Sequence, residues 1–309
     1  MNRRYGRMLL LLAALWGASF LFIRIASPVL GPVVLVDLRV FIAGGALVFY
    51  ALRSARLPAL WSHWKAYLLL GAVNAAFPFT LIAFAELHLP ASLAATLNAT
   101  TPLFTAIVAA FWLHDRLTAR KVIGLVVGII GVGILVGWSA LPLNTTLFLS
   151  VGASLAAAGC YGIGGVYSKV AFKGTPPLAL AIGQQLGAGF LLFPFAVLTL
   201  PTVFPSVPVL LAVAALALLS TSVAYLLYFH LMATVGPINT LTVTFLVPVF
   251  SLLWGVLFLG ESLSLAWLIG LVVILLSLML VTGIRFRLPS AQRLQALLPM
   301  REKQPEKGR

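Results

Sequence analysis

Ten apolar stretches run along most of the chain, separated by short segments that contain most of the charged residues. An α-helix needs about 20 residues to cross the hydrocarbon core of a bilayer, so these stretches predict transmembrane helices. The strict alternation of apolar and polar residues that a membrane β-barrel requires is absent. The predicted helices cover approximately residues 8–27, 33–52, 67–87, 92–113, 121–139, 147–167, 178–199, 207–229, 238–259 and 266–284.

The second half of this pattern repeats the first. Residues 102–137 match residues 248–283 without a gap, 146 positions further on, and Trp16 matches Tyr161 with an offset of 145. Each half holds five predicted helices, an odd number, so the two halves have opposite orientations in the membrane. We therefore predict an all-α integral membrane protein with ten transmembrane helices in two inverted five-helix repeats. The predicted units are residues 1–140, residues 141–284 and a basic cytoplasmic tail, residues 285–309.

The composition indicates that lipid covers most of the surface. Hydrophobic residues make up 62% of the chain and charged residues 8%, with a mean hydropathy of +1.12. This leaves too few polar side chains to cover a soluble globule. The first apolar stretch follows "NRRYGR" like a secretory signal, but its length and the lack of a convincing small-residue cleavage site predict a retained helix. The single cysteine, Cys160, excludes an internal disulfide and a Cys-rich metal site.

The basic residues predict the orientation in the membrane. Of the 20 Lys and Arg residues, 18 fall in segments that share one side of the membrane, and the exceptions are Arg24 and Arg39. The positive-inside rule therefore places both termini in the cytoplasm of a multi-pass inner (plasma) membrane protein. The net charge of +14 is a topology signal, so the lipid bilayer and a small-molecule substrate are expected partners and nucleic acid is not. A homodimer remains open.

Several features have structural interpretations. No nucleophile elbow, phosphate loop or metal-ligand spacing occurs in the sequence, so we predict neither an enzyme nor a cofactor or metal. Glycines at small-xxx-small spacing predict close helix packing; they are Gly124, Gly128, Gly133 and Gly137. Asp115 and Glu261 occupy equivalent positions and are expected near the amino-terminal end of a following helix.

Inverted repeats place the substrate site near the membrane midplane, so polar and aromatic groups within the helices are pathway candidates. Asn98 and Thr101 share one helix face beside Pro102, and Thr244 and Pro248 repeat this arrangement. The alternative is that each hydroxyl bonds to a carbonyl of its own helix. The predicted substrate pathway consists of Trp16, Ser19, Arg39, Asn98, Thr101, Pro102, Tyr161, Gln184, Gln185, Tyr225, Thr244 and Pro248.

Arg39 lies roughly 9 Å into its predicted helix, at 1.5 Å per residue. An arginine at this depth must face the helix bundle or a wet cavity. Three interpretations remain open: contact with a solute or gate, an ion pair with Asp37 or Glu86, and extension to the outer surface. Gating or coupling residues are sought among Asp37, Glu86 and His230, although a local hydrogen-bonded role is favoured for His230 and transport without proton coupling is slightly favoured overall.

The motifs "WGASFLFIRIA" and "LRVFIAGGAL" and the doubled "P…F…D/E-x-L-[TS]…G" block resemble the EamA family of the drug/metabolite transporter superfamily, over residues 8–284. The resemblance implies a central cavity lined by the first four helices of each half, with the fifth of each half behind them. It also implies export of amino acids or related metabolites across the bacterial inner membrane. Asp115 and Arg24 stand where Glu and Lys are usual, and both preserve the charge.

The expected function is therefore a secondary transporter that moves small organic solutes by alternating access. The competing interpretation is a non-transporting membrane scaffold or an intramembrane enzyme.

Overall fold

The computed structural model describes residues 3–54, 63–137, 141–262 and 264–283, and every regular element in this part of the chain is helical. The predicted tail, residues 285–309, lies outside the described residues. Nine described helices are long and apolar enough to cross a membrane, and Trp267–Thr282 forms a shorter apolar helix. The nine are Arg4–Leu30, Pro32–Arg53, Trp64–Ala85, Ala91–Trp112, Ala119–Gly137, Thr145–Ala171, Pro177–Leu198, Val207–Val235 and Asn239–Leu259. The prediction of an all-α membrane protein is confirmed.

Several of these spans are made of shorter elements. In chain order the elements are α1 (Arg3–Leu30), α2 (Pro32–Arg53), α3 (Trp64–Gly71), η2 (Ala72–Ala76), α4 (Phe77–Ala85), α5 (Ala91–Asn98), α6 (Thr101–Trp112), α7 (Ala119–Gly137), α8 (Thr145–Ala171), α9 (Pro177–Leu198), α10 (Val207–Ala217), η3 (Leu218–Val223), α11 (Ala224–Val235), α12 (Pro237–Leu241), α13 (Val243–Leu259) and α14 (Leu265–Thr282).

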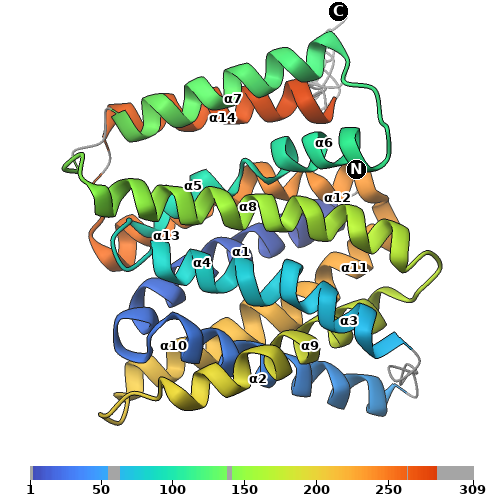
Figure 1. Ribbon diagram of the computed structural model, residues 1–309, viewed down its shortest axis with the longest axis vertical. Helices are drawn as coiled ribbons and strands as arrows, with labels where there is room; N and C mark the ends of the chain where they lie inside the picture. Colours follow the sequence, from blue (N-terminus) through green and yellow to red (C-terminus); the bar gives the residue numbers. More distant parts are fainter. Residues whose placement is uncertain (1–2, 55–62, 138–140, 263, 284–309) are drawn as a thin grey trace, which may run out of the picture.

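The helices run from side to side in Figure 1, so their connections gather at two opposite ends. The turns after α1, α4, α9 and α13 lie at the left, which we name the Glu261 end after a residue of the last turn. The turns after α2, α6, α8 and α11 lie at the right, which we name the Asp115 end.

The third span of each half contains one turn of π-helix. These turns, η2 and η3, begin at Ala72 and Leu218, 146 positions apart. A π-turn widens the helix by one residue, and such turns occur frequently at functional sites. They place Asn74 and the run Ser220–Ser222 in the middle of their spans, inside the bundle.

The two prolines of the repeated block act differently. Pro102 is in the first turn of α6, and the helix is interrupted just before it, between α5 and α6. This agrees with the loss of an amide donor at proline and the restricted backbone of the preceding residue. Pro248 instead lies inside α13, and the corresponding interruption falls earlier, at Thr242. The repeats are therefore similar in sequence but differ in where their fourth helix breaks.

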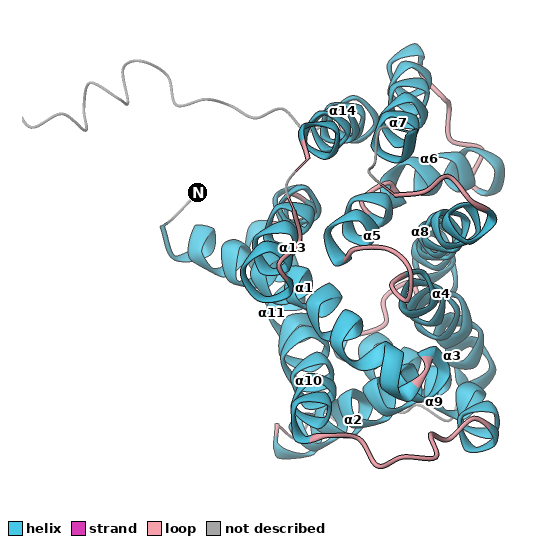
Figure 2. Cartoon of the chain, turned by 90° about the vertical axis from the view of Figure 1, so that its left-hand side faces the viewer, coloured by secondary structure: helices cyan, strands magenta, loops and turns pink. Residues whose placement is uncertain are grey.

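The fifth helices of the two halves, α7 and α14, pack against each other at one edge of the bundle (Figure 2). Gly124 and Gly128 form this contact as predicted, because a Cβ at Gly124 would lie 3.0 Å from the Ser277 carbonyl oxygen and one at Gly128 would lie 2.8 Å from Ser277 Oγ. The prediction is wrong for Gly133 and Gly137, where a Cβ would meet no heavy atom of the described residues within 4 Å. Gly131 provides the third close contact.

Candidate functional site

Arg39 is buried in α2, with 6% of its surface exposed, and its guanidinium contacts groups from two other helices. Its central carbon lies 3.6 Å from the centroid of the Phe79 ring of α4. Its Nε donates a hydrogen bond of 3.0 Å to Thr221 Oγ1 of η3. A planar guanidinium stacked on an aromatic ring gains a cation–π attraction, which is larger when both groups are shielded from water. The stack fixes the orientation of the cation in the bundle.

The π-turn explains why Thr221 can accept this bond. The Thr221 hydroxyl donates to the Leu216 carbonyl oxygen, 2.8 Å away and five residues earlier, as the wider turn allows. Its remaining lone pairs are then free to accept from Arg39. The local backbone geometry of η3 therefore positions the arginine of the other half.

A second polar contact joins the two halves beside Arg39. Asn74 of η2 donates from Nδ2 to Gln184 Oε1 of α9, 2.7 Å away, and Gln184 is 4% exposed. The Tyr225 phenol lies next to Gln184, and Tyr161 and Tyr225 both interact electrostatically with Arg39. The Tyr161 and Phe79 rings meet edge to face, with centroids 6.2 Å apart. We define the central polar cluster as Arg39, Asn74, Phe79, Tyr161, Gln184, Thr221 and Tyr225.

Among the described residues no carboxylate forms a direct salt bridge with Arg39, although Glu86 interacts with it electrostatically. Glu86 is fully buried, yet neither of its carboxylate oxygens has a hydrogen-bond partner. Arg24 donates its hydrogen bond to the backbone carbonyl oxygen of Glu86 and attracts the Glu86 carboxylate without bonding to it, and Asp37 Oδ1 is buried without a partner. The prediction of a directly contacting ion pair with Glu86 or Asp37 is therefore wrong, and so is the extension of Arg39 to the surface, because Arg39 is buried. The guanidinium keeps its two Nη groups free of hydrogen bonds to described residues.

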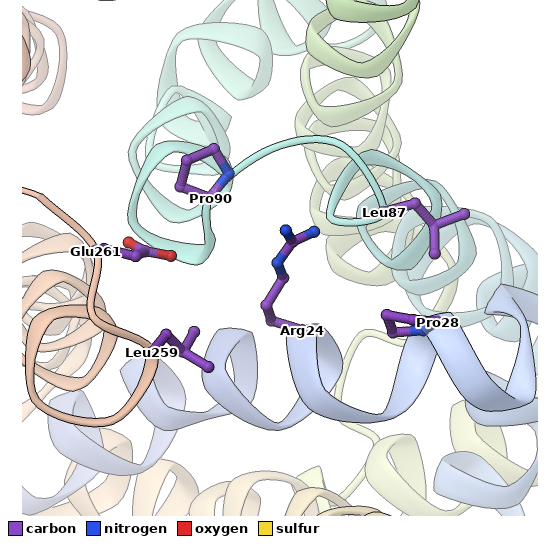
Figure 3. A pocket seen from close by; sticks show the side chains of 6 residues that line it. All are labelled: Arg24, Pro28, Leu87, Pro90, Leu259 and Glu261. Atoms are coloured by element: carbon purple, nitrogen blue, oxygen red, sulfur yellow. The ribbon is translucent and has the colours of Figure 1, made fainter. Parts of the chain in front are cut away.

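A pocket lies at the Glu261 end, with a volume of about 390 Å³. In Figure 3 the side chains of Arg24 and Glu261 border it, and Pro90 lies close to the Glu261 carboxylate. Its lining consists of Arg24, Pro28, Leu87, Pro90, Leu259 and Glu261. The pocket thus carries one basic and one acidic group, and it lies at an end of the bundle rather than in the central polar cluster.

Other predicted pathway residues have local partners. Ser19 donates to the Trp16 carbonyl oxygen at 2.6 Å, and the Trp16 ring lies 5.4 Å from that of Tyr228. Thr101 donates to the Asn98 carbonyl oxygen at 2.7 Å, and Thr244 to that of Leu241 at 2.8 Å. These hydroxyls bond to carbonyl oxygens of neighbouring residues in the chain, which is the alternative to a pathway role that the sequence left open.

Three further predicted residues, Gln185, Asn98 and His230, have no side-chain hydrogen bond to the central polar cluster among the described residues. Gln185 is fully buried, and neither amide atom has a hydrogen-bond partner. Asn98 Oδ1 is also buried without a partner. His230 is exposed near the end of α11, which agrees with a role outside the buried cluster.

Sequence reasoning missed three members of the cluster, namely Asn74, Phe79 and Thr221. Asn74 and Thr221 are polar residues within otherwise apolar spans, which is the signal that led to Asn98 and Thr101. Phe79 is 146 positions before Tyr225, so the repeat itself relates the two aromatic residues that flank Arg39. The same offset pairs Asn74 with Ser220 but Thr221 with Ala75, so the repeat does not reveal Thr221.

Comparison with known proteins agrees with this architecture. The sequence profile of the EamA-like transporter family matches residues 4–137 and again residues 148–283. One solved crystal structure superposes with a TM-score of 0.64 at 21% identity, covering 96% of this chain and 100% of that chain, which shows a shared fold.

Three curated relatives extend the comparison. The uncharacterized transporter YvbV of Bacillus subtilis is 25% identical over 90% of this chain and 91% of its own length. The uncharacterized inner membrane transporter YedA of Escherichia coli K12 is 29% identical, over 93% and 95%. A protein of Salmonella typhimurium named "Probable amino-acid metabolite efflux pump" is 26% identical, over 93% and 98%. With both halves matched by the same family, the chain belongs to the EamA-like transporter family.

Proposed function

We propose that this protein is a secondary transporter that exports small carboxylate-bearing solutes, amino acids or related metabolites, by alternating access. The observation that supports the substrate class is Arg39, a buried cation that no carboxylate of the described residues contacts directly and that only Glu86 attracts from further away. A buried charge is costly unless it is paired. A solute anion at this position would provide the direct partner that the protein itself does not provide.

The chemistry of the central polar cluster fits such a solute. The Nη groups of Arg39 can bind a carboxylate with two parallel hydrogen bonds, while the Phe79 stack and the Thr221 bond hold the guanidinium in place. The amide of Gln184 offers both donors and acceptors for an amino or hydroxyl group. The rings of Tyr161 and Tyr225 supply apolar surface for the rest of the solute.

The direction and location follow from charge and from the relatives. The basic residues predict that the Asp115 end faces the cytoplasm, with both termini on that side. One relative is named an inner membrane transporter and another an efflux pump for amino-acid metabolites, which favours outward transport across a bacterial inner membrane.

The test is uptake into proteoliposomes of purified protein, with radiolabelled leucine, phenylalanine, threonine and glutamate as probes. Arg39→Ala should reduce uptake per folded molecule about tenfold or more, because it removes a charged hydrogen-bond donor. Arg39→Lys should recover part of it, since it keeps the charge but loses the planar stack. Arg53→Ala is the matched control, because Arg53 is on the same helix and exposed.

Two results would contradict the proposal. The first is uptake of none of the four probes by folded wild-type protein. The second is a wild-type rate for folded Arg39→Ala, which would keep transport but remove Arg39 from the solute site.

A further inference from the structure

The two halves cross at two glycines that occupy equivalent positions in the repeats. A Cβ at Gly17 of α1 would lie 2.8 Å from the Ser251 backbone nitrogen of α13. A Cβ at Gly162 of α8 would lie 2.9 Å from the Thr105 backbone nitrogen of α6. Gly162 follows Gly17 by 145 positions, and Ser251 follows Thr105 by 146. Backbones in such close contact form two matching crossings between the halves.

At the Glu261 end, beside the pocket that Arg24 and Glu261 line, hydrogen bonds join the two halves. The Glu261 carboxylate accepts from the Ala91 backbone nitrogen at 2.6 Å, from the Ser92 backbone nitrogen at 3.2 Å and from the Ser92 hydroxyl. Ser251 adds a bond of 3.2 Å from its hydroxyl to the Ala91 carbonyl oxygen. The first turn of α5, from one half, is thus held against α13 and its following loop, from the other half. Figure 3 shows Glu261 next to Pro90, where α5 begins.

The equivalent hydrogen bonds between the halves are absent at the Asp115 end among the described residues. Asp115, 146 positions before Glu261, is exposed, and its side chain has no hydrogen bond to a described residue. Thr105, the equivalent of Ser251, donates to the Thr101 carbonyl oxygen within its own helix at 2.9 Å. In the described chain α5 packs against α13, whereas α12 packs against α11 and makes no comparable contact with α6. The repeats are therefore related in sequence but differ in the contacts that their helices make with the other half.

From this asymmetry we infer that Glu261 is a positioning residue of the transport cycle, whose bonds to α5 hold the two halves together at the Glu261 end. The inference rests on the proposed function, because alternating access requires each end to close in turn. A carboxylate that accepts backbone amides at a helix amino terminus forms charge-assisted bonds and meets the positive end of the helix dipole. Opening this end must break these bonds, so Glu261 sets the balance between the two states.

The experiment measures thiol accessibility at this contact, in a protein whose single cysteine is replaced by Cys160→Ser. Ser251→Cys is the reporter, because Ser251 is 1% exposed at the contact between the halves and the change is isosteric. Adding Glu261→Gln should raise the rate of maleimide labelling about tenfold, since it removes the charge that accepts the α5 amides. Asp115→Asn is the matched control at the equivalent position and should leave the rate unchanged.

Further variants keep the result interpretable. His88→Cys reports an exposed position at the same end and should be labelled at the same rate in every background. Ser92→Ala removes only the hydroxyl bond and should raise reporter labelling less, about threefold, which provides a test if Glu261→Gln fails to fold. Leu89→Cys, at a fully buried position before α5, repeats the measurement without altering the Ser251 bond.

An unchanged labelling rate at both reporters in folded Glu261→Gln protein, or an equal increase from Asp115→Asn, would overturn the inference. The labelling needs no solute. The experiment therefore tests the role of Glu261 separately from the transport function, which the proteoliposome uptake measures.

Discussion

Asn74 donates a hydrogen bond of 2.7 Å from Nδ2 to Oε1 of Gln184, so a residue of the first half orients a residue of the second. Asn74 is itself confined on the other side, because its Oδ1 would lie 2.7 Å from a Cβ added at Gly164 of α8. The Gln184 side chain is therefore held in a fixed orientation beside the Tyr225 phenol.

Replacing Asn74 should weaken solute binding more than it weakens the fold. Asn74→Ala removes the donor to Gln184 Oε1, and loss of a buried hydrogen bond costs about 1–3 kcal/mol, so KM for uptake should rise about tenfold. Ser220→Ala is the matched control, since Ser220 is 146 positions further on and its buried hydroxyl has no hydrogen-bond partner. KM is measured in proteoliposomes, and equal effects of the two changes would contradict the role of Asn74.

Helix packing gives a prediction independent of transport. Gly128→Leu should lower the free energy of unfolding by about 1–3 kcal/mol or prevent assembly, because the new side chain would meet Leu103 and Ser277. Gly133→Leu, on the same helix, faces open space and should have little effect. Thermal unfolding in detergent, followed by size-exclusion chromatography, compares the two. A similar loss in both variants would show that α7 does not pack as described.

The fold was largely predictable because a bilayer sets the length and polarity of each span. The ten apolar stretches correspond to the observed helices to within a few residues at most boundaries, with α1, α8 and the α10–α11 span extending further. The error at Gly133 and Gly137 has a geometric cause. Gly133 follows Gly128 by five residues, a rotation of about 140° at 3.6 residues per turn, so it points away from the contact. Gly131 follows Gly128 by three residues and lies on the contact face.

The site was only partly predictable. Arg39 and Gln184 stand out in the sequence because polar groups in apolar spans are costly and because the repeat aligns them. Asn74 and Thr221 depend on π-turns, and hydropathy does not reveal the hydrogen-bond pattern that forms such turns. Thr101 carries the same polar signal but bonds to its own helix. Composition therefore identifies polar groups, and only tertiary structure separates those that meet from those that are satisfied locally.

The cation–π contact between Arg39 and the Phe79 ring should contribute to solute binding, because it holds the guanidinium in place. Phe79→Leu keeps an apolar side chain but removes a cation–π attraction of about 0.5–2 kcal/mol, so KM should rise about 3- to 30-fold. Phe84→Leu, on the same helix but exposed, should leave KM unchanged. Wild-type KM in folded Phe79→Leu would show that Thr221 alone orients the guanidinium.

The orientation is tested by single-cysteine labelling with a membrane-impermeant maleimide in intact cells, on the Cys160→Ser background. Reagent from outside should reach His88→Cys and Leu143→Cys, which are exposed positions on the side predicted to be extracellular. It should miss Ala119→Cys and Lys173→Cys until the membrane is permeabilised, because the basic turns at the Asp115 end are expected in the cytoplasm. These four positions avoid the Asn144 cap of α8 and the positive φ of Gly174, so substitution leaves the backbone unstrained. Labelling of Ala119→Cys and Lys173→Cys from outside, with His88→Cys protected, would reverse the orientation. It would then place the Glu261 end on the cytoplasmic side.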